Sequence, residues 1–96
     1  MKVLSEPIEF EWDKGNIGKN LAGHKVLDQE CEEAFFDSNK EITKDAFHSD
    51  KEDRYVLLGK TKQQRLLFVV FTIRNCRVRV ISARDINKKE SKSYYA

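Results

Sequence analysis

Alternating apolar and polar positions predict a β-sheet in the second half of the chain. Strands are expected over residues 54–61, 65–74 and 77–84, and the short connections at 62–64 and 75–76 suit hairpins. The middle of the expected sheet is apolar on both faces. We therefore expect further elements to pack on each side of it.

A two-residue turn at 75–76 fixes the register of the last hairpin. Arg74 then faces Arg77 across the two strands, which is a mildly unfavourable pair of like charges. The same register predicts Val70 opposite Ile81. Along one face it continues with Thr72 opposite Arg79 and Phe68 opposite Ala83.

The first quarter of the chain has a different pattern. Residues 8–12 alternate apolar and acidic side chains, as in a half-buried strand. Asp13 suits a helix N-cap, and Ile17, Leu21 and His24 follow on one helical stripe. This stripe predicts a first helix whose apolar face is buried, with His24 on it.

The remaining elements complete an α+β pattern. Asp28 suits the N-cap of a second helix, residues 41–47 suit an edge strand, 48–53 a loop, and 86–95 a C-terminal helix. We expect one domain, residues 1–96, in which the N-terminal helices and the C-terminal helix pack on a small antiparallel sheet.

Composition excludes several classes of protein. The apolar run at 66–71 is the longest in the chain and is too short to span a membrane. Cys31 and Cys76 are too few for a disulfide scaffold, so we expect reduced thiols and a cytoplasmic protein. No cysteine or histidine spacing indicates a metal site, and we expect no cofactor.

Charge is distributed unevenly along the chain. Residues 1–53 contain 7 Lys, no Arg and 14 acidic residues, whereas residues 54–96 contain all 6 Arg, 5 Lys and only two acidic residues. Arginine presents a planar fork that binds phosphate or carboxylate with two hydrogen bonds. The basic half therefore predicts phosphate handling, while the acidic half suits either a solvated face or a surface for a basic partner.

His48 is the first candidate for proton transfer, because histidine titrates near neutral pH without help. It precedes Glu52 and Arg54, and Glu52 suits either orienting His48 or pairing with Arg54 or Arg79. Arg79, in the middle of a strand, requires a carboxylate or phosphate partner. The catalytic candidates are His48, Glu52, Arg54 and Arg79; the alternative for His48 is a loop residue with no role, or one that contacts a partner.

A second group of residues is expected to bind RNA or phosphate. Arg65 and Arg84 are expected near each other at one end of the sheet, while Arg74 and Arg77 lie at the hairpin tip. Tyr94 suits either stacking on a base or packing on the sheet.

Several short motifs occur in an order and spacing that resemble the BrnT family of toxins. The motifs are FEWD at 10–13, FD at 36–37, HSD at 48–50, EDRY at 52–55, RLLFVV at 65–70 and RVISAR at 79–84, with Asn20, His24, Val26, Gly59, Thr72, Arg74, Glu90 and Tyr94 between or behind them. Two positions depart from the family pattern. Gly23 stands where a lysine is usual, and Gln64 stands where a glycine is frequent.

The resemblance implies a RelE-like fold and a ribonuclease toxin of a type II toxin–antitoxin system. It also implies a BrnA-like ribbon-helix-helix antitoxin that neutralises the toxin, with the complex binding operator DNA. The toxin itself would be monomeric or dimerised through the antitoxin. The alternative is a module without enzymatic activity that binds nucleic acid or a partner through its arginine-rich sheet.

Overall fold

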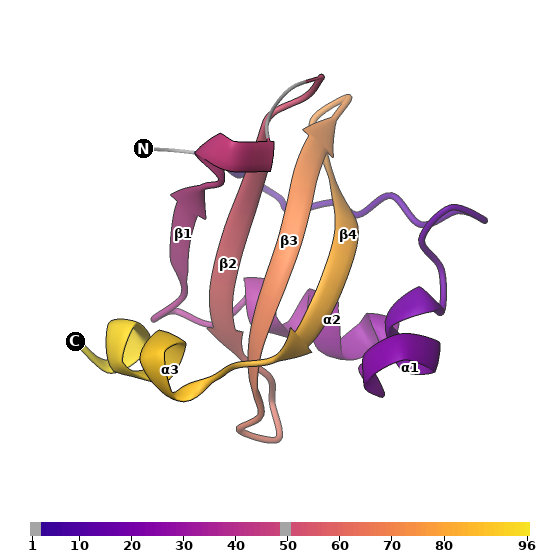
Figure 1. Ribbon diagram of the computed structural model, residues 1–96. Coiled ribbons are helices and arrows are strands. Elements are labelled where there is room, and N and C mark those ends of the chain that lie inside the picture. The colour runs from indigo at the N-terminus through magenta and orange to yellow at the C-terminus, as the bar shows by residue number, and fades with distance from the viewer. Residues whose placement is uncertain (1–2, 49–50) are drawn as a thin grey trace.

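The computed structural model describes residues 3–48 and 51–96 and confirms the α+β class (Figure 1). Four antiparallel strands form one sheet in the order β1-β2-β3-β4. This architecture agrees with the expected RelE-like arrangement. The elements are α1 (Lys19–His24), α2 (Asp28–Phe35), β1 (Glu41–Lys44), the 3-10 helix η1 (Ala46–His48), β2 (Arg54–Lys60), β3 (Leu66–Arg74), β4 (Arg77–Asp85) and α3 (Lys88–Tyr95).

The core lies between α2 and one face of the sheet, which Figure 1 shows in front of α2. Phe35 of α2 is fully buried and packs edge-on against Phe71 of β3, with ring centroids 5.0 Å apart. Gly59 of β2 permits this close packing, because a Cβ there would lie 2.5 Å from the carbonyl oxygen of Ala34. The opposite face of the sheet carries α3 at one end.

The N-terminal segment runs along the edge of β4. Phe10 forms an isolated parallel bridge with Val78, so the expected strand over 8–12 is reduced to one bridge. Farther along, Asn16 donates to the Val80 carbonyl, and the Ala83 N–H donates to the Asn20 side chain. These contacts satisfy backbone groups on a strand edge that would otherwise lack partners.

The predicted first helix is wrong in its start and in its burial. Asp13 accepts hydrogen bonds from the backbone of Gly15, Asn16 and Ile17, forming a turn, and α1 begins only at Lys19. Gly18, with φ 69°, separates the two segments. Ile17, Leu21 and His24 are all exposed, because α1 packs on β4 through Asn20 instead.

The predicted register of the last hairpin holds near the turn and fails beyond it. Arg74 pairs with Arg77 and Thr72 with Arg79, but a β-bulge then places Val70 opposite Ser82 and Phe68 opposite Arg84. The extra residue, Ile81, rotates the end of β4. Ala83 therefore turns into the core and Arg84 turns to the face that carries α3.

Other expectations need smaller changes. Leu27, rather than Asp28, is the N-cap of α2, and the edge strand is shorter than expected. Cys31 and Cys76 are free thiols, as predicted. Within residues 3–48 and 51–96, no helix has the length and apolar character needed to cross a membrane.

Candidate functional site

Arginines from three strands gather on the sheet face that carries α3, at the end away from this helix. Arg54 of β2 pairs with Thr72 of β3, which pairs with Arg79 of β4. Paired residues point to the same side of a sheet, and so do residues two apart on one strand. Arg74 and Arg77 therefore lie on this face beside Arg79.

Two adjoining cavities open here. One, of about 290 Å³, is lined by His48, Lys51, Glu52 and Arg54. The other, of about 210 Å³, shares Glu52 and Arg54 with it and adds Arg74 and Arg79, among others. Together these cavities form what we call the arginine site, which comprises His48, Glu52, Arg54, Arg74 and Arg79. It contains all four predicted catalytic residues and one predicted phosphate-binding arginine.

His48 ends η1 and its side chain is 69% exposed. Its Nδ1 lies 2.9 Å from Oδ2 of Asp45, and the other oxygen of this carboxylate, Oδ1, accepts a hydrogen bond from the Phe47 N–H. Asp45, three residues before the histidine, therefore orients the ring from the Nδ1 side. The sequence pattern did not single out Asp45, although a carboxylate at this spacing in a helical turn is a detectable signal.

Glu52 pairs with Arg74 rather than with Arg54, Arg79 or His48. The guanidinium of Arg74 donates two hydrogen bonds of 3.0 Å to its carboxylate. The hydrogen bond from Arg74, followed by the charges of Arg74, Arg54 and Arg79, lowers the pKa of Glu52 although partial burial opposes this. Glu52 is thus ionised at neutral pH.

Arg79 has the carboxylate partners that its mid-strand position requires. Its side chain is 13% exposed, and it donates to Glu11 at 3.0 Å and to both oxygens of Asp13 at 2.8 and 2.9 Å. The hydrogen bond from Arg79, together with that from the Gly15 N–H, lowers the pKa of Asp13. Gly15 leaves room for this guanidinium, since a Cβ there would lie 2.5 Å from Arg79 Nη2.

Arg65 and Arg84 do not form the predicted pair. Arg65 donates to Asp85 at 2.7 Å and to Glu30 of α2 at 3.1 Å, on the core side of the sheet. Arg84, turned by the bulge, donates to Glu90 of α3 at 2.8 and 2.9 Å on the opposite side. The β-bulge is the physical reason for this separation.

The last two predicted phosphate-binding residues are Arg77, which begins β4 at the hairpin tip, and Tyr94, which lies in α3. Arg77 is exposed at the hairpin tip and has no ion-pair partner among residues 3–48 and 51–96. The Tyr94 hydroxyl donates to Asp37 Oδ2 at 2.5 Å, which favours packing over an open stacking position. Burial and then Asp37 raise the pKa of Tyr94 to about 12.

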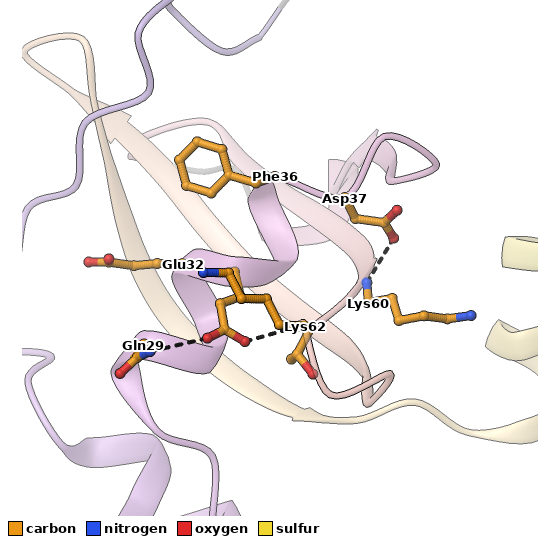
Figure 2. Close-up of a pocket in the computed structure, with 8 residues that line it drawn as sticks. Gln29, Glu32, Phe36, Asp37, Lys60 and Lys62 are labelled. Atoms are coloured by element: carbon orange, nitrogen blue, oxygen red, sulfur yellow. Dashed lines mark hydrogen bonds between the residues drawn. The ribbon is translucent and has the colours of Figure 1, made fainter.

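A further cavity, of about 510 Å³, lies between α2 and the β2–β3 connection (Figure 2). Its carboxylates are already engaged: Asp37 accepts from the Lys60 N–H at 2.8 Å, and Glu33 accepts from the Lys62 N–H at 3.1 Å. Neither an arginine nor a histidine lines it. Lys60 and Lys62 could attract a phosphate, but the cavity offers neither a histidine for proton transfer nor an arginine fork for a bidentate phosphate contact.

Metal ligands are not grouped in the part of the chain that the structure describes. Among residues 3–48 and 51–96, no three His, Cys, Asp or Glu side chains are arranged to hold a metal ion. Asp50, which the sequence places near Glu52 and Asp53, lies outside the described residues. Asp53 pairs with Lys44 at 3.3 Å.

Comparison with protein families identifies a family whose model covers most of the chain. The family model described as "Ribonuclease toxin, BrnT, of type II toxin-antitoxin system" matches residues 12–90, which include every residue of the arginine site. No curated protein sequence matches the chain.

Proposed function

Because the chain belongs to the BrnT family of ribonuclease toxins of type II toxin–antitoxin systems, we propose that it is an endoribonuclease whose chemistry takes place in the arginine site. The family implies an RNA substrate and an antitoxin partner. The observation that carries the proposal is that His48 and three arginines line two adjoining cavities.

His48 is the proposed general base. With Nδ1–H donated to Asp45, the lone pair on Nε2 is available to remove a proton from a ribose 2′-hydroxyl. The 2′-oxygen then bonds to the adjacent phosphorus, and the bond from phosphorus to the 5′-oxygen breaks. The leaving oxygen takes a proton from water, giving a 2′,3′-cyclic phosphate and a 5′-hydroxyl without a metal ion.

The arginines are proposed to stabilise the charge that develops on the phosphate. Arg54 and Arg74 line the cavities, and a phosphate can replace the Glu52 carboxylate as the partner of Arg74, whose side chain is half exposed. Phosphate contact with Arg79 requires displacement of Asp13, which is more exposed than Glu11. Arg79 is therefore proposed to anchor the N-terminal segment in the free protein and to contact the phosphate only when Asp13 is displaced.

The test is incubation of a defined RNA with the purified chain in EDTA, comparing the native protein with His48→Ala and His24→Ala. His24 is the matched control, because it is the other histidine, is exposed and does not line the arginine site. We expect the native chain and His24→Ala to cleave RNA equally, and His48→Ala to be at least 100-fold slower, the lower range for loss of a general base.

Other outcomes would change the proposal. Equal cleavage by all three proteins would remove His48 from the mechanism and leave catalysis to Glu52 and the arginines. Salt-sensitive RNA binding without cleavage would support the alternative, a binding module without enzymatic activity.

The antitoxin is proposed to be a BrnA-like ribbon-helix-helix protein. In this proposal the complex binds operator DNA, acts in the cytoplasm, and contains a toxin that is monomeric or dimerised through the antitoxin. Four exposed apolar side chains lie in the acidic half of the chain: Ile17 before α1, Leu21 within it, and Leu27 and Phe36 at the two ends of α2. They support docking of a partner with basic and apolar residues on the side of the molecule formed by α1 and α2. We call these four residues the apolar patch.

A further inference from the structure

A groove of about 470 Å³ lies between α3 and the sheet, on the same face as the arginine site. Its floor is apolar and consists of Val56, Leu58 and Phe68, and its rim includes Glu41 and Ser93. We call it the α3 groove. Nothing in the proposed cleavage mechanism uses it.

We propose that the α3 groove binds a nucleobase of the RNA substrate, one or two nucleotides away from the phosphate held in the arginine site. This inference rests on the proposed function, because it assigns a part of the same substrate. A nucleobase is flat, apolar on its faces and polar at its edge, which matches an apolar floor with a polar rim.

Phe68 provides the aromatic part of the floor. The Arg84 guanidinium lies over its ring, 4.0 Å from the centroid, and two hydrogen bonds from Arg84 to Glu90 hold it there. Arg84 thus fixes one face of the ring without lining the groove, and the part of Phe68 that lines the groove is a rigid aromatic surface on which a base can stack with little sequence preference. The β-bulge creates this arrangement, since the register without it would place Ala83 opposite Phe68.

The register of the sheet fixes the relation between groove and arginine site. Arg54 and Arg79 flank Thr72 in one cross-strand row. Leu58 and Arg84 flank Phe68, which lies four residues earlier in β3. Four residues of extended strand span roughly 13 Å. An extended RNA chain crosses this interval within two nucleotides, so one molecule reaches both places.

The rim provides a basis for base preference. Ser93 Oγ donates to Glu41 Oε1 at 2.8 Å and links α3 to β1 across the groove. Within the described part of the chain, the second oxygen, Glu41 Oε2, accepts no hydrogen bond. A carboxylate only accepts hydrogen bonds. Adenine, cytosine and guanine each offer an exocyclic amino group to this oxygen, whereas uracil offers only its ring N3–H, so we expect the three amino bases to be preferred.

The experiment measures equilibrium binding to a mixed-sequence 2′-O-methyl hexanucleotide, which cannot be cleaved, and to six derivatives that each lack one base. We expect the loss of one particular base to weaken binding to the native chain roughly 5- to 150-fold, the range that base stacking supports. Equal binding of all seven RNAs would overturn the proposal.

Two substitutions at one exposed position locate the effect. Ser93→Trp fills the α3 groove, whereas Ser93→Ala removes only the hydrogen bond to Glu41. We expect Ser93→Trp to bind the parent RNA and the sensitive derivative equally, and Ser93→Ala to keep the discrimination. If Ser93→Trp is unfolded by circular dichroism, Thr43→Trp fills the groove from the opposite rim.

The remaining outcomes have distinct meanings. Unchanged discrimination in a folded groove-filled variant overturns the proposal, and loss of antitoxin binding in that variant would then assign the groove to the protein partner. Glu41→Gln should reduce the preference for 2′-O-methyl hexanucleotides of adenosine or cytidine over the hexanucleotide of uridine. An unchanged preference would show that Glu41 does not contribute to base recognition. Because binding does not depend on cleavage, failure of the RNA cleavage assay would overturn the proposed function alone.

Discussion

Arg79 illustrates how one charged residue both shapes the arginine site and supports the fold. It binds two carboxylates of the N-terminal segment while remaining largely excluded from solvent. Removing the guanidinium would leave Glu11 and Asp13 close together without a cation. The N-terminal segment would then lose an anchor on β4.

We predict that Arg79→Ala lowers the free energy of unfolding by about 1–3 kcal/mol, the range for losing hydrogen bonds between charged groups. Arg77→Ala is the matched control, since Arg77 lies two residues away on the same face and is exposed. It should change stability by less than about 0.5 kcal/mol. Urea unfolding measures both, and equal effects would show that the ion pairs of Arg79 contribute nothing to the fold.

Tyr94 and Asp37 form a second pair whose ionisation can be measured. Because the pKa of Tyr94 is raised from 10.0 to about 12, its contribution to stability is complete below pH 10 and lost between pH 10 and about 12. Burial opposes ionisation of Asp37, but hydrogen bonds from Tyr94 and the Asn39 and Lys60 N–H groups outweigh it and lower its pKa. The Asp37 contribution is therefore present above pH 4 and lost in more acid solution.

We predict that phenolate absorbance shows a component titrating near pH 12 that Tyr94→Phe removes and Tyr95→Phe retains. Asp37→Asn should move this midpoint toward lower pH, because the negative charge that opposes phenolate formation is gone. A midpoint unaffected by Asp37→Asn would show that the hydrogen bond does not form in solution.

For single residues, the sequence predicts which chemical group a side chain needs as its partner better than it predicts which residue supplies that group. The need of Arg79 for a carboxylate or phosphate followed from its place in a strand, but Glu11 and Asp13 lie 68 and 66 residues away along the chain. Only the topology, which lays the N-terminal segment beside β4, brings them together. Asp45 was closer to detection, because its three-residue spacing to His48 is local.

At the scale of elements, the three long strands β2, β3 and β4 were predictable because period-2 alternation records which side chains face each layer. The β-bulge at Ile81 was not, since an inserted residue leaves no signal in residues 80–83, where small and apolar side chains suit either face of the sheet. Similarly, the stripe of Ile17 and Leu21 indicates a helix but does not say whether anything in the same chain covers it.

The β3–β4 turn holds two residues other than glycine in a left-handed backbone conformation that favours glycine. Asn75 and Cys76 both have positive φ, 51° and 65°, and the second position of such a turn favours glycine. We predict that Cys76→Gly raises the free energy of unfolding by about 0.5–1 kcal/mol, whereas Cys76→Ser, which keeps a Cβ, changes it little. Thermal unfolding of both variants tests this; stabilisation by serine as well would attribute the gain to loss of the thiol.

At the scale of the whole molecule, the acidic half has a role that charge counting alone did not reveal. Among the residues that the structure describes, its carboxylates pair with arginines of the basic half through Glu30 to Arg65, Glu52 to Arg74, and Asp13 with Glu11 to Arg79. Arg74 and Arg79 of the arginine site are therefore already paired with carboxylates, Glu52 within the site and Glu11 and Asp13 beside it. A polyanion must compete with these carboxylates, and its binding should weaken as salt rises, because neutralised phosphates release their counterions.

The arginine site and the apolar patch can be tested separately by one pair of substitutions. Phe36, in the apolar patch, is 64% exposed, and Tyr95, at the end of α3, is 63% exposed. We predict that Phe36→Ala weakens binding of the cognate antitoxin at least 10-fold and leaves RNA cleavage unchanged, since loss of a large apolar anchor at an interface has about this effect.

Tyr95→Ala, matched in exposure, should leave antitoxin binding within about twofold, because an exposed contact outside an interface core contributes little. Titration calorimetry with the antitoxin measures both variants. Unchanged affinity of Phe36→Ala would exclude the apolar patch as the docking surface, and loss of cleavage in this variant would show that the two faces are not independent.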